Sequence, residues 1–106
     1  MIIAVDFDGT LCADAYPEIG APNQYLIEQL KLKREQGTKL ILWTCRSHKD
    51  LADAVEWCKQ QGLEFDAVND NLSECTMRFG NNSRKIYADI YLDDKACGPL
   101  NTVGVI

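Results

Sequence analysis

The fold is decided by the first eleven residues of the chain, Met1-Ile2-Ile3-Ala4-Val5-Asp6-Phe7-Asp8-Gly9-Thr10-Leu11. The apolar run from Ile2 to Val5 predicts a strand buried on both faces, and Gly9 supplies the turn after it. Because side chains repeat every two residues along an extended chain, we expect Asp6 and Asp8 to point to the same side. Two carboxylates that close repel each other, and a divalent cation such as Mg²⁺ would relieve the repulsion. A surface turn, in which Asp and Gly are also common, is the alternative interpretation.

Length and composition limit the possible classes of protein. A chain of 106 residues has room for one domain without a separate lid, and we expect residues 1–106 to form it. The formal net charge of −5 weighs against a nucleic-acid partner. No apolar run is long enough for a membrane span or a signal peptide. The five cysteines form no C-x-x-C pair and are typical of reduced thiols in a cytoplasmic protein: Cys12, Cys45, Cys58, Cys75 and Cys97.

The next part of the chain predicts a loop, a helix and a strand. Residues 12–21 follow neither the helical nor the strand period, and they contain Pro17 and Gly20, so we expect a loop. Pro22 suits the first turn of a helix and Gly37 suits its end. The apolar residues 40–43 then predict a second buried strand, ending at Thr44-Cys45-Arg46-Ser47.

A second helix is expected after this strand. Ser47, with Asp50 three residues later, resembles a capping box, and Gly62 is expected to end the helix. The residues between them repeat at helical spacing and predict a core-facing stripe that includes Cys58: Leu51, Ala54, Val55 and Cys58.

The rest of the chain completes an alternating pattern. We expect a strand over residues 65–68, a short helix over 72–78, a strand over 90–92 and an edge strand over 102–106. The alternation predicts an α/β protein, a three-layer α/β/α sandwich with a mostly parallel Rossmann-like sheet and helices on both faces.

Polar residues follow several of the expected strands. The carboxyl ends of parallel strands meet at one edge of a sheet, so we expect these residues to gather there: Asp6, Asp8, Thr44, Asp93 and Asp94. Carboxylates in such a group would bind Mg²⁺ and leave room for a phosphate. Asp6 could then attack phosphorus, Asp8 could transfer protons, and Thr44 with Lys85 could hold the phosphoryl oxygens.

The same residues resemble the haloacid dehalogenase superfamily, whose members are mostly Mg²⁺-dependent phosphatases. Asp6-Phe7-Asp8-Gly9-Thr10 matches its D-x-D-G-T motif, and Leu40-Ile41-Leu42-Trp43-Thr44 resembles its second motif. Lys85 can stand for the third, a single Lys or Arg, and Leu92-Asp93-Asp94 resembles the fourth. The motifs occur in the family's order over residues 6–94, and the chain looks most like its small capless members from bacteria and phages.

This resemblance implies a role for each motif residue. Asp6 would be the nucleophile and a metal ligand, and Asp8 the general acid/base that binds the metal through its backbone carbonyl. Asp93 would be the third protein ligand, with Asp94 supporting it, although the two roles could be reversed. Lys85 would contact the phosphoryl group, with Arg84 and Lys95 as alternatives.

Two residues after the second motif are further candidates for binding substrate. Arg46 could contact substrate or lie on the surface at the start of a helix. Cys45 lies beside Thr44, and we interpret it as packing, or else as a substrate neighbour whose thiol would make the site sensitive to oxidation. Capless relatives tend to act on large substrates or to close the site by oligomerising, so a homo-oligomer is compatible with the chain.

Three other classes stay open. A non-catalytic module could bind Mg²⁺ or phosphate on the same residues. A phospho-receiver domain also clusters acids, a Thr and a Lys, but its acid pair follows the first strand, whereas here the pair follows the strand at 90–92. A purely structural domain with a charged edge is the third.

Overall fold

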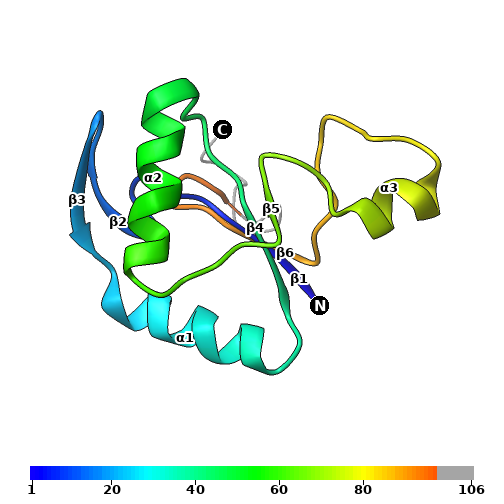
Figure 1. Cartoon of the computed structure of the whole chain (residues 1–106), viewed down its shortest axis with the longest axis horizontal. Helices are drawn as coiled ribbons and strands as arrows, with labels where there is room; N and C mark the ends of the chain where they lie inside the picture. Colours follow the sequence, from blue (N-terminus) through cyan, green and yellow to red (C-terminus); the bar gives the residue numbers. More distant parts are fainter. Residues whose placement is uncertain (98–106) are drawn as a thin grey trace.

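A four-stranded parallel sheet forms the centre of the computed structural model, which describes residues 1–97 (Figure 1). The strand order is β5-β4-β1-β6. The strands are β1 (Ile2–Val5), β4 (Lys39–Leu42), β5 (Ala67–Val68) and β6 (Ile90–Leu92). These positions confirm the strands expected from the sequence, with a shorter third strand. The edge strand expected over residues 102–106 lies outside the described residues.

Strand β1 lies in the middle of the sheet because it is apolar on both faces. Ile3, Ala4 and Val5 are all buried. In the parallel register, Ala4 is paired with Ile41 of β4 on one side and with Tyr91 of β6 on the other. The continuous apolar run therefore fits a strand with a neighbour on each side and a layer over each face.

Two helices cover one face of the sheet, α1 (Gln24–Glu35) and α2 (His48–Gln60) (Figure 1). Ile27 and Leu30 of α1, with Ala54 and Cys58 of α2, are buried against the sheet. Burial raises the pKa of Cys58 to about 12, so this thiol fills the core, as its helical spacing predicts.

The opposite face is covered by α3 (Ser73–Phe79) and by the segment that leads into β6. The buried residues of this second layer are Ala4, Ile41, Leu72, Cys75, Ile86 and Ala88. Buried Asn71 holds the segment together: its amide donates to Asn82 Oδ1 at 2.9 Å and accepts from the Tyr87 amide at 2.7 Å. The predicted helices on both faces are therefore confirmed.

The prediction of a loop over residues 12–21 is wrong. These residues form an antiparallel hairpin, β2 (Cys12–Ala15) and β3 (Glu18–Pro22), at the left edge of Figure 1. Most of the hairpin is exposed, so its sequence lacks the apolar alternation that identifies a half-buried strand. Contacts from distant residues support it, as described below for Arg46.

The start of the first helix and the capping of the second differ from the expectation. Pro22 is the last residue of β3, and Asn23 caps α1 by accepting a hydrogen bond from the Leu26 amide at 3.2 Å. Ser47 stands at the N-cap of α2, but its side chain makes no capping hydrogen bond. The expected capping box is therefore wrong, and Asp50 instead accepts a hydrogen bond from the hydroxyl of Tyr16 at 3.1 Å.

Within residues 1–97, no helix combines the length and the apolar character that crossing a membrane would require.

Candidate functional site

Three carboxylates meet where two adjacent parallel strands end. Asp6 follows β1, and Asp93 and Asp94 follow β6. One oxygen from each of the three lies within 4.8 Å of the others. We call these residues the acidic triad. The connection through α1 leaves β1 toward β4, while β6 lies on its other side, so the triad sits where the sheet changes winding direction, the usual position of ligand sites in open α/β sheets.

The turn after β1 holds the triad together. The Thr10 hydroxyl donates to Asp6 Oδ2 at 3.1 Å and accepts from the backbone amide of Asp94 at 3.1 Å. Gly9 has a φ of +86°, and a Cβ at this position would collide with the Asp94 carboxylate. Gly9 is therefore needed both for its conformation and for the close approach of Asp94.

Asp6 lies in an environment that opposes its negative charge. Partial burial, followed by the charge of Asp93, raises the pKa of Asp6 to about 6. Three oxygen ligands of this type, with an uncompensated negative charge, fit a hard divalent cation such as Mg²⁺.

A cavity of about 520 Å³ opens beside the triad. The hairpin, the loop after β4 and the loop after β6 all contribute to its lining, which consists of Asp6, Asp8, Asp14, Tyr16, Cys45, Arg46, Asp93, Asp94 and Lys95. Asp6 and Asp8 thus face one cavity, as their spacing predicts.

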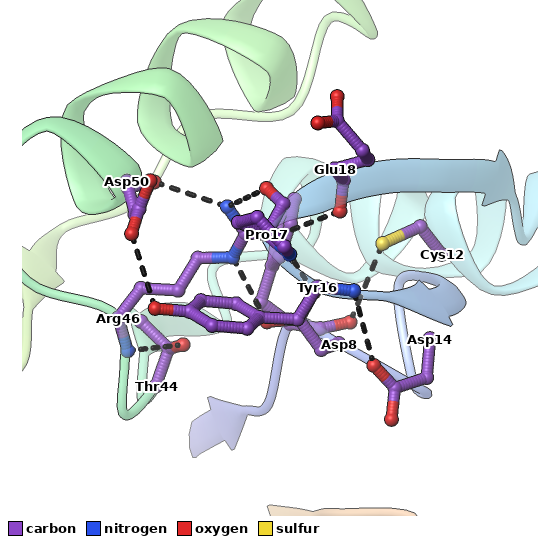
Figure 2. A network of polar contacts seen from close by, with 10 residues as sticks. Asp8, Cys12, Asp14, Tyr16, Pro17, Glu18, Thr44, Arg46 and Asp50 are labelled. Carbon is purple, nitrogen blue, oxygen red and sulfur yellow. Dashed lines mark hydrogen bonds and ion pairs between the residues drawn. The ribbon is translucent and has the colours of Figure 1, made fainter.

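Asp8 is neutralised by a side chain rather than left to a metal ion. Arg46 Nε donates to Asp8 Oδ2 at 2.9 Å, and Arg46 Nη2 donates to Asp8 Oδ1 at 2.8 Å (Figure 2). The side chain of Arg46 is only 1% exposed and that of Asp8 is 19% exposed. The hydrogen bonds to Asp8 raise the pKa of Arg46, which opposes deprotonation of the buried guanidinium.

The remaining N–H groups of Arg46 bind backbone carbonyls from two other elements. Nη1 donates to the carbonyls of Pro17 and Asp50, and Nη2 donates to that of Glu18 at 2.9 Å (Figure 2). With Asp8, these bonds use the five N–H groups of the guanidinium. Arg46 therefore joins the hairpin, the β1 loop and α2. Of the two interpretations of this residue, the surface position is therefore wrong.

Sequence reasoning missed this role of Arg46. Asp8 and Arg46 are 38 residues apart in the chain. Asp8 follows β1 and Arg46 follows the neighbouring strand β4. Two opposite charges after adjacent strands are the feature of the sequence that could have predicted this ion pair.

The other candidate residues are placed differently. Cys45 is exposed and lines the cavity, so the interpretation as packing is wrong. Thr44 lies at the end of β4, where its hydroxyl accepts from the Arg46 amide at 3.2 Å and its own amide donates to Asn69. The structure does not bring Lys85 to the triad. Lys85 lines a separate cavity, where its Nζ lies 5.7 Å from the centroid of the Tyr91 ring. Lys95 is the lysine that lines the cavity.

Comparison with known proteins finds one informative relative. No protein-family model matches the chain, and no match appears among curated proteins. A solved structure, described as that of a conserved protein coded by locus from Bacteroides thetaiotaomicron, is 41% identical in sequence, with a TM-score of 0.82. The match covers 99% of this chain and 84% of the other. The chain therefore belongs to the same family as this conserved Bacteroides thetaiotaomicron protein.

Proposed function

We propose that this protein is a Mg²⁺-dependent phosphomonoester hydrolase of the haloacid dehalogenase type, with Asp6 as the nucleophile. The observation that carries the proposal is the convergence of Asp6, Asp93 and Asp94 within 4.8 Å at the ends of β1 and β6. The D-x-D-G-T sequence leads directly from β1 into this site. A cytoplasmic location belongs to the same proposal, and all five cysteines are free thiols.

The acidic triad would hold the Mg²⁺ ion. When bound, the ion would neutralise the carboxylates and polarise a phosphoryl oxygen of the substrate. Asp6 is partly buried, whereas Asp93 and Asp94 are exposed, so the triad remains open toward the cavity. Asp8 could add its backbone carbonyl.

The side chains of the cavity support the following sequence of steps. A carboxylate oxygen of Asp6 bonds to phosphorus as the bond from phosphorus to the leaving oxygen breaks, which forms an aspartyl-phosphate. Asp8 transfers a proton to the leaving oxygen and later accepts one from the water that hydrolyses the intermediate. Lys95, which lines the cavity, replaces Lys85 as the cation proposed to hold the phosphoryl oxygens.

A non-catalytic module that binds Mg²⁺ or phosphate is the second candidate. Two observations favour it: both oxygens of Asp8 already accept hydrogen bonds from Arg46, and Lys85 lies over a separate hollow. Catalysis by Asp8 therefore requires that it exchange a proton while, or after, its contact with Arg46 changes.

The experiment that separates the two candidates measures phosphate release from a panel of phosphomonoesters with Mg²⁺ or with a chelator. We expect turnover by the wild type that disappears with chelator and in Asp6→Asn. The matched control is Asp53→Asn, because Asp53 is an acid on α2 that pairs with Lys49 and does not line the cavity. Mg²⁺ binding without turnover would favour the module, and equal activity of Asp6→Asn and wild type would exclude Asp6 as the nucleophile.

A further inference from the structure

We propose that Tyr16 determines specificity by stacking against a planar aromatic group of the substrate. The substrate class would then be small phosphate monoesters that carry an aromatic ring, either a nucleobase or an aryl group. This inference rests on the proposed phosphatase function and names the substrates of the same cavity.

The first observation is the position of Tyr16. It lies in the turn between β2 and β3 and lines the same cavity as the acidic triad. The residue is 58% exposed. A phosphate held at the triad would therefore have its leaving group in a cavity that contains an exposed aromatic ring.

The second observation is that this exposed ring is held in place. Its hydroxyl donates to Asp50 Oδ2 at 3.1 Å, and the Cζ of Arg46 lies 5.1 Å from the ring centroid (Figure 2). Arg46 is itself buried and bound to Asp8. Tyr25 of α1, 77% exposed, makes no hydrogen bond through its hydroxyl within residues 1–97. A ring that is already held loses less conformational freedom when a ligand stacks on it.

The charges of the side chains that line the cavity further restrict the class of ligand that it can bind. Five carboxylates and two cations, Arg46 and Lys95, line the cavity. One divalent cation at the triad would leave little positive charge for additional phosphates. A single phosphate with an uncharged leaving group fits this charge balance better than a polyphosphate or an oligonucleotide.

The test uses pairs of substrates that differ in the ring but not in the type of leaving oxygen. Benzyl phosphate is compared with cyclohexylmethyl phosphate, and adenosine 5′-monophosphate with ribose 5-phosphate, by kcat/KM in the presence of Mg²⁺. The first pair measures the preference for an aryl group, and the second pair measures the preference for a nucleobase. The proteins are the wild type, Tyr16→Leu, Tyr16→Phe and the control Tyr25→Leu.

We expect the wild type to prefer the aromatic member of at least one pair by about three- to tenfold, as stacking energies suggest. In Tyr16→Leu the ratio of kcat/KM between the aromatic and the non-aromatic member of that pair should fall to about one, whatever the absolute activity of the variant. Tyr25→Leu should retain the preference, and Tyr16→Phe, which keeps the ring but loses the hydrogen bond to Asp50, should retain most of it. No preference in the wild type, or an unchanged preference in Tyr16→Leu, would overturn the proposal.

Calorimetric binding with Mg²⁺ separates this inference from the proposed function. If no substrate is turned over, the phosphatase proposal fails. Tighter binding of the aromatic member of at least one pair, lost in Tyr16→Leu, would still support stacking by Tyr16. Equal affinities within both pairs, or no binding of any of the four compounds, would overturn it.

Discussion

Asp6 and Asp8 are two residues apart, yet their charges are balanced in different ways. Asp8 has Arg46, which donates to both of its oxygens. Asp6 has the carboxylates of Asp93 and Asp94 as neighbours, and within residues 1–97 the Thr10 hydroxyl is the only side-chain donor to it. The sequence predicts repulsion between Asp6 and Asp8. In the structure, Asp6 is instead repelled by the carboxylates that follow β6, Asp93 above all. The uncompensated negative charge therefore lies at the triad and not at Asp8.

The first prediction concerns the pH dependence of stability without metal. Because the pKa of Asp6 is raised from 3.8 to about 6, the folded state binds this proton more tightly than the unfolded state. The contribution of Asp6 to the free energy of unfolding is therefore greatest at low pH and is lost as the pH rises to about 6. Asp6→Asn lacks this loss, so its Tm relative to wild type should increase between about pH 4 and pH 7.

Thermal unfolding with a chelator measures this effect, with Asp53→Asn as the control. Mg²⁺ at neutral pH should raise the Tm of the wild type and have a smaller effect on Asp6→Asn. Parallel pH profiles of wild type and Asp6→Asn would show that Asp6 has an ordinary environment.

The second prediction concerns Arg46. Arg46→Met removes the cation that pairs with Asp8 and leaves the carbonyls of Pro17 and Glu18 without their donor. We expect the free energy of unfolding to fall by about 3 kcal/mol, because breaking a buried pair leaves a carboxylate uncompensated. Lys49→Met breaks the exposed pair with Asp53 and should lower stability far less than Arg46→Met does. Denaturant unfolding compares the two, and equal losses would mean that Arg46 has no special role.

Among the secondary structure elements, those with a buried apolar face could be predicted from the sequence. Strands β1 and β4 are apolar runs in the sequence, as buried strands are. Helix α2 repeats its buried residues at the helical spacing. The hairpin could not be predicted, because its exposed residues have little to bury and Arg46 holds its carbonyls from 28 and 29 residues away. The prediction of a capping box was wrong because a tertiary contact took its place: the carboxylate of Asp50 accepts a hydrogen bond from the hydroxyl of Tyr16.

The third prediction concerns the turn after β1. Gly9 and Gly37 both have positive φ, +86° and +97°, so alanine at either site should cost roughly 1–2 kcal/mol. A Cβ at Gly9 would also displace the Asp94 carboxylate, whereas a Cβ at Gly37 has no atom within 4 Å. Gly9→Ala should therefore lose most of the Mg²⁺-dependent rise in Tm, and Gly37→Ala should keep it. Equal responses to Mg²⁺ would argue against Asp94 as a ligand.

For the whole molecule, the order of the strands explains which site residues could be predicted. Asp6, Asp93 and Asp94 come together because β6 pairs with β1, a neighbour relation that an alternating α/β pattern favours. The position of Lys85 depends on the segment between α3 and β6, which follows no period. That segment is arranged by the hydrogen bonds of buried Asn71, and it directs Lys85 toward the Tyr91 ring instead of the triad.

The two faces of the sheet are unequally packed, which leads to the last prediction. Among residues 1–97, the core under α1 and α2 contains twelve buried residues, and the core under α3 contains six. Only Cys75 of α3 is buried, so the α3 segment should open locally at a lower free energy than α1 and α2. Native-state hydrogen exchange should therefore show less protected amides in α3.

Two core substitutions distinguish local from global opening. Ile27 and Leu72 are both nearly inaccessible to solvent, one in each core. Ile27→Ala should lower the free energy of global unfolding by about 2–5 kcal/mol and accelerate exchange throughout the sheet. Leu72→Ala should mainly accelerate exchange in α3, and the amides of α1 and α2 should change less. If both variants lowered protection equally in all three helices, the chain would unfold as one cooperative unit, and movement of α3 would require the acidic triad to come apart as well.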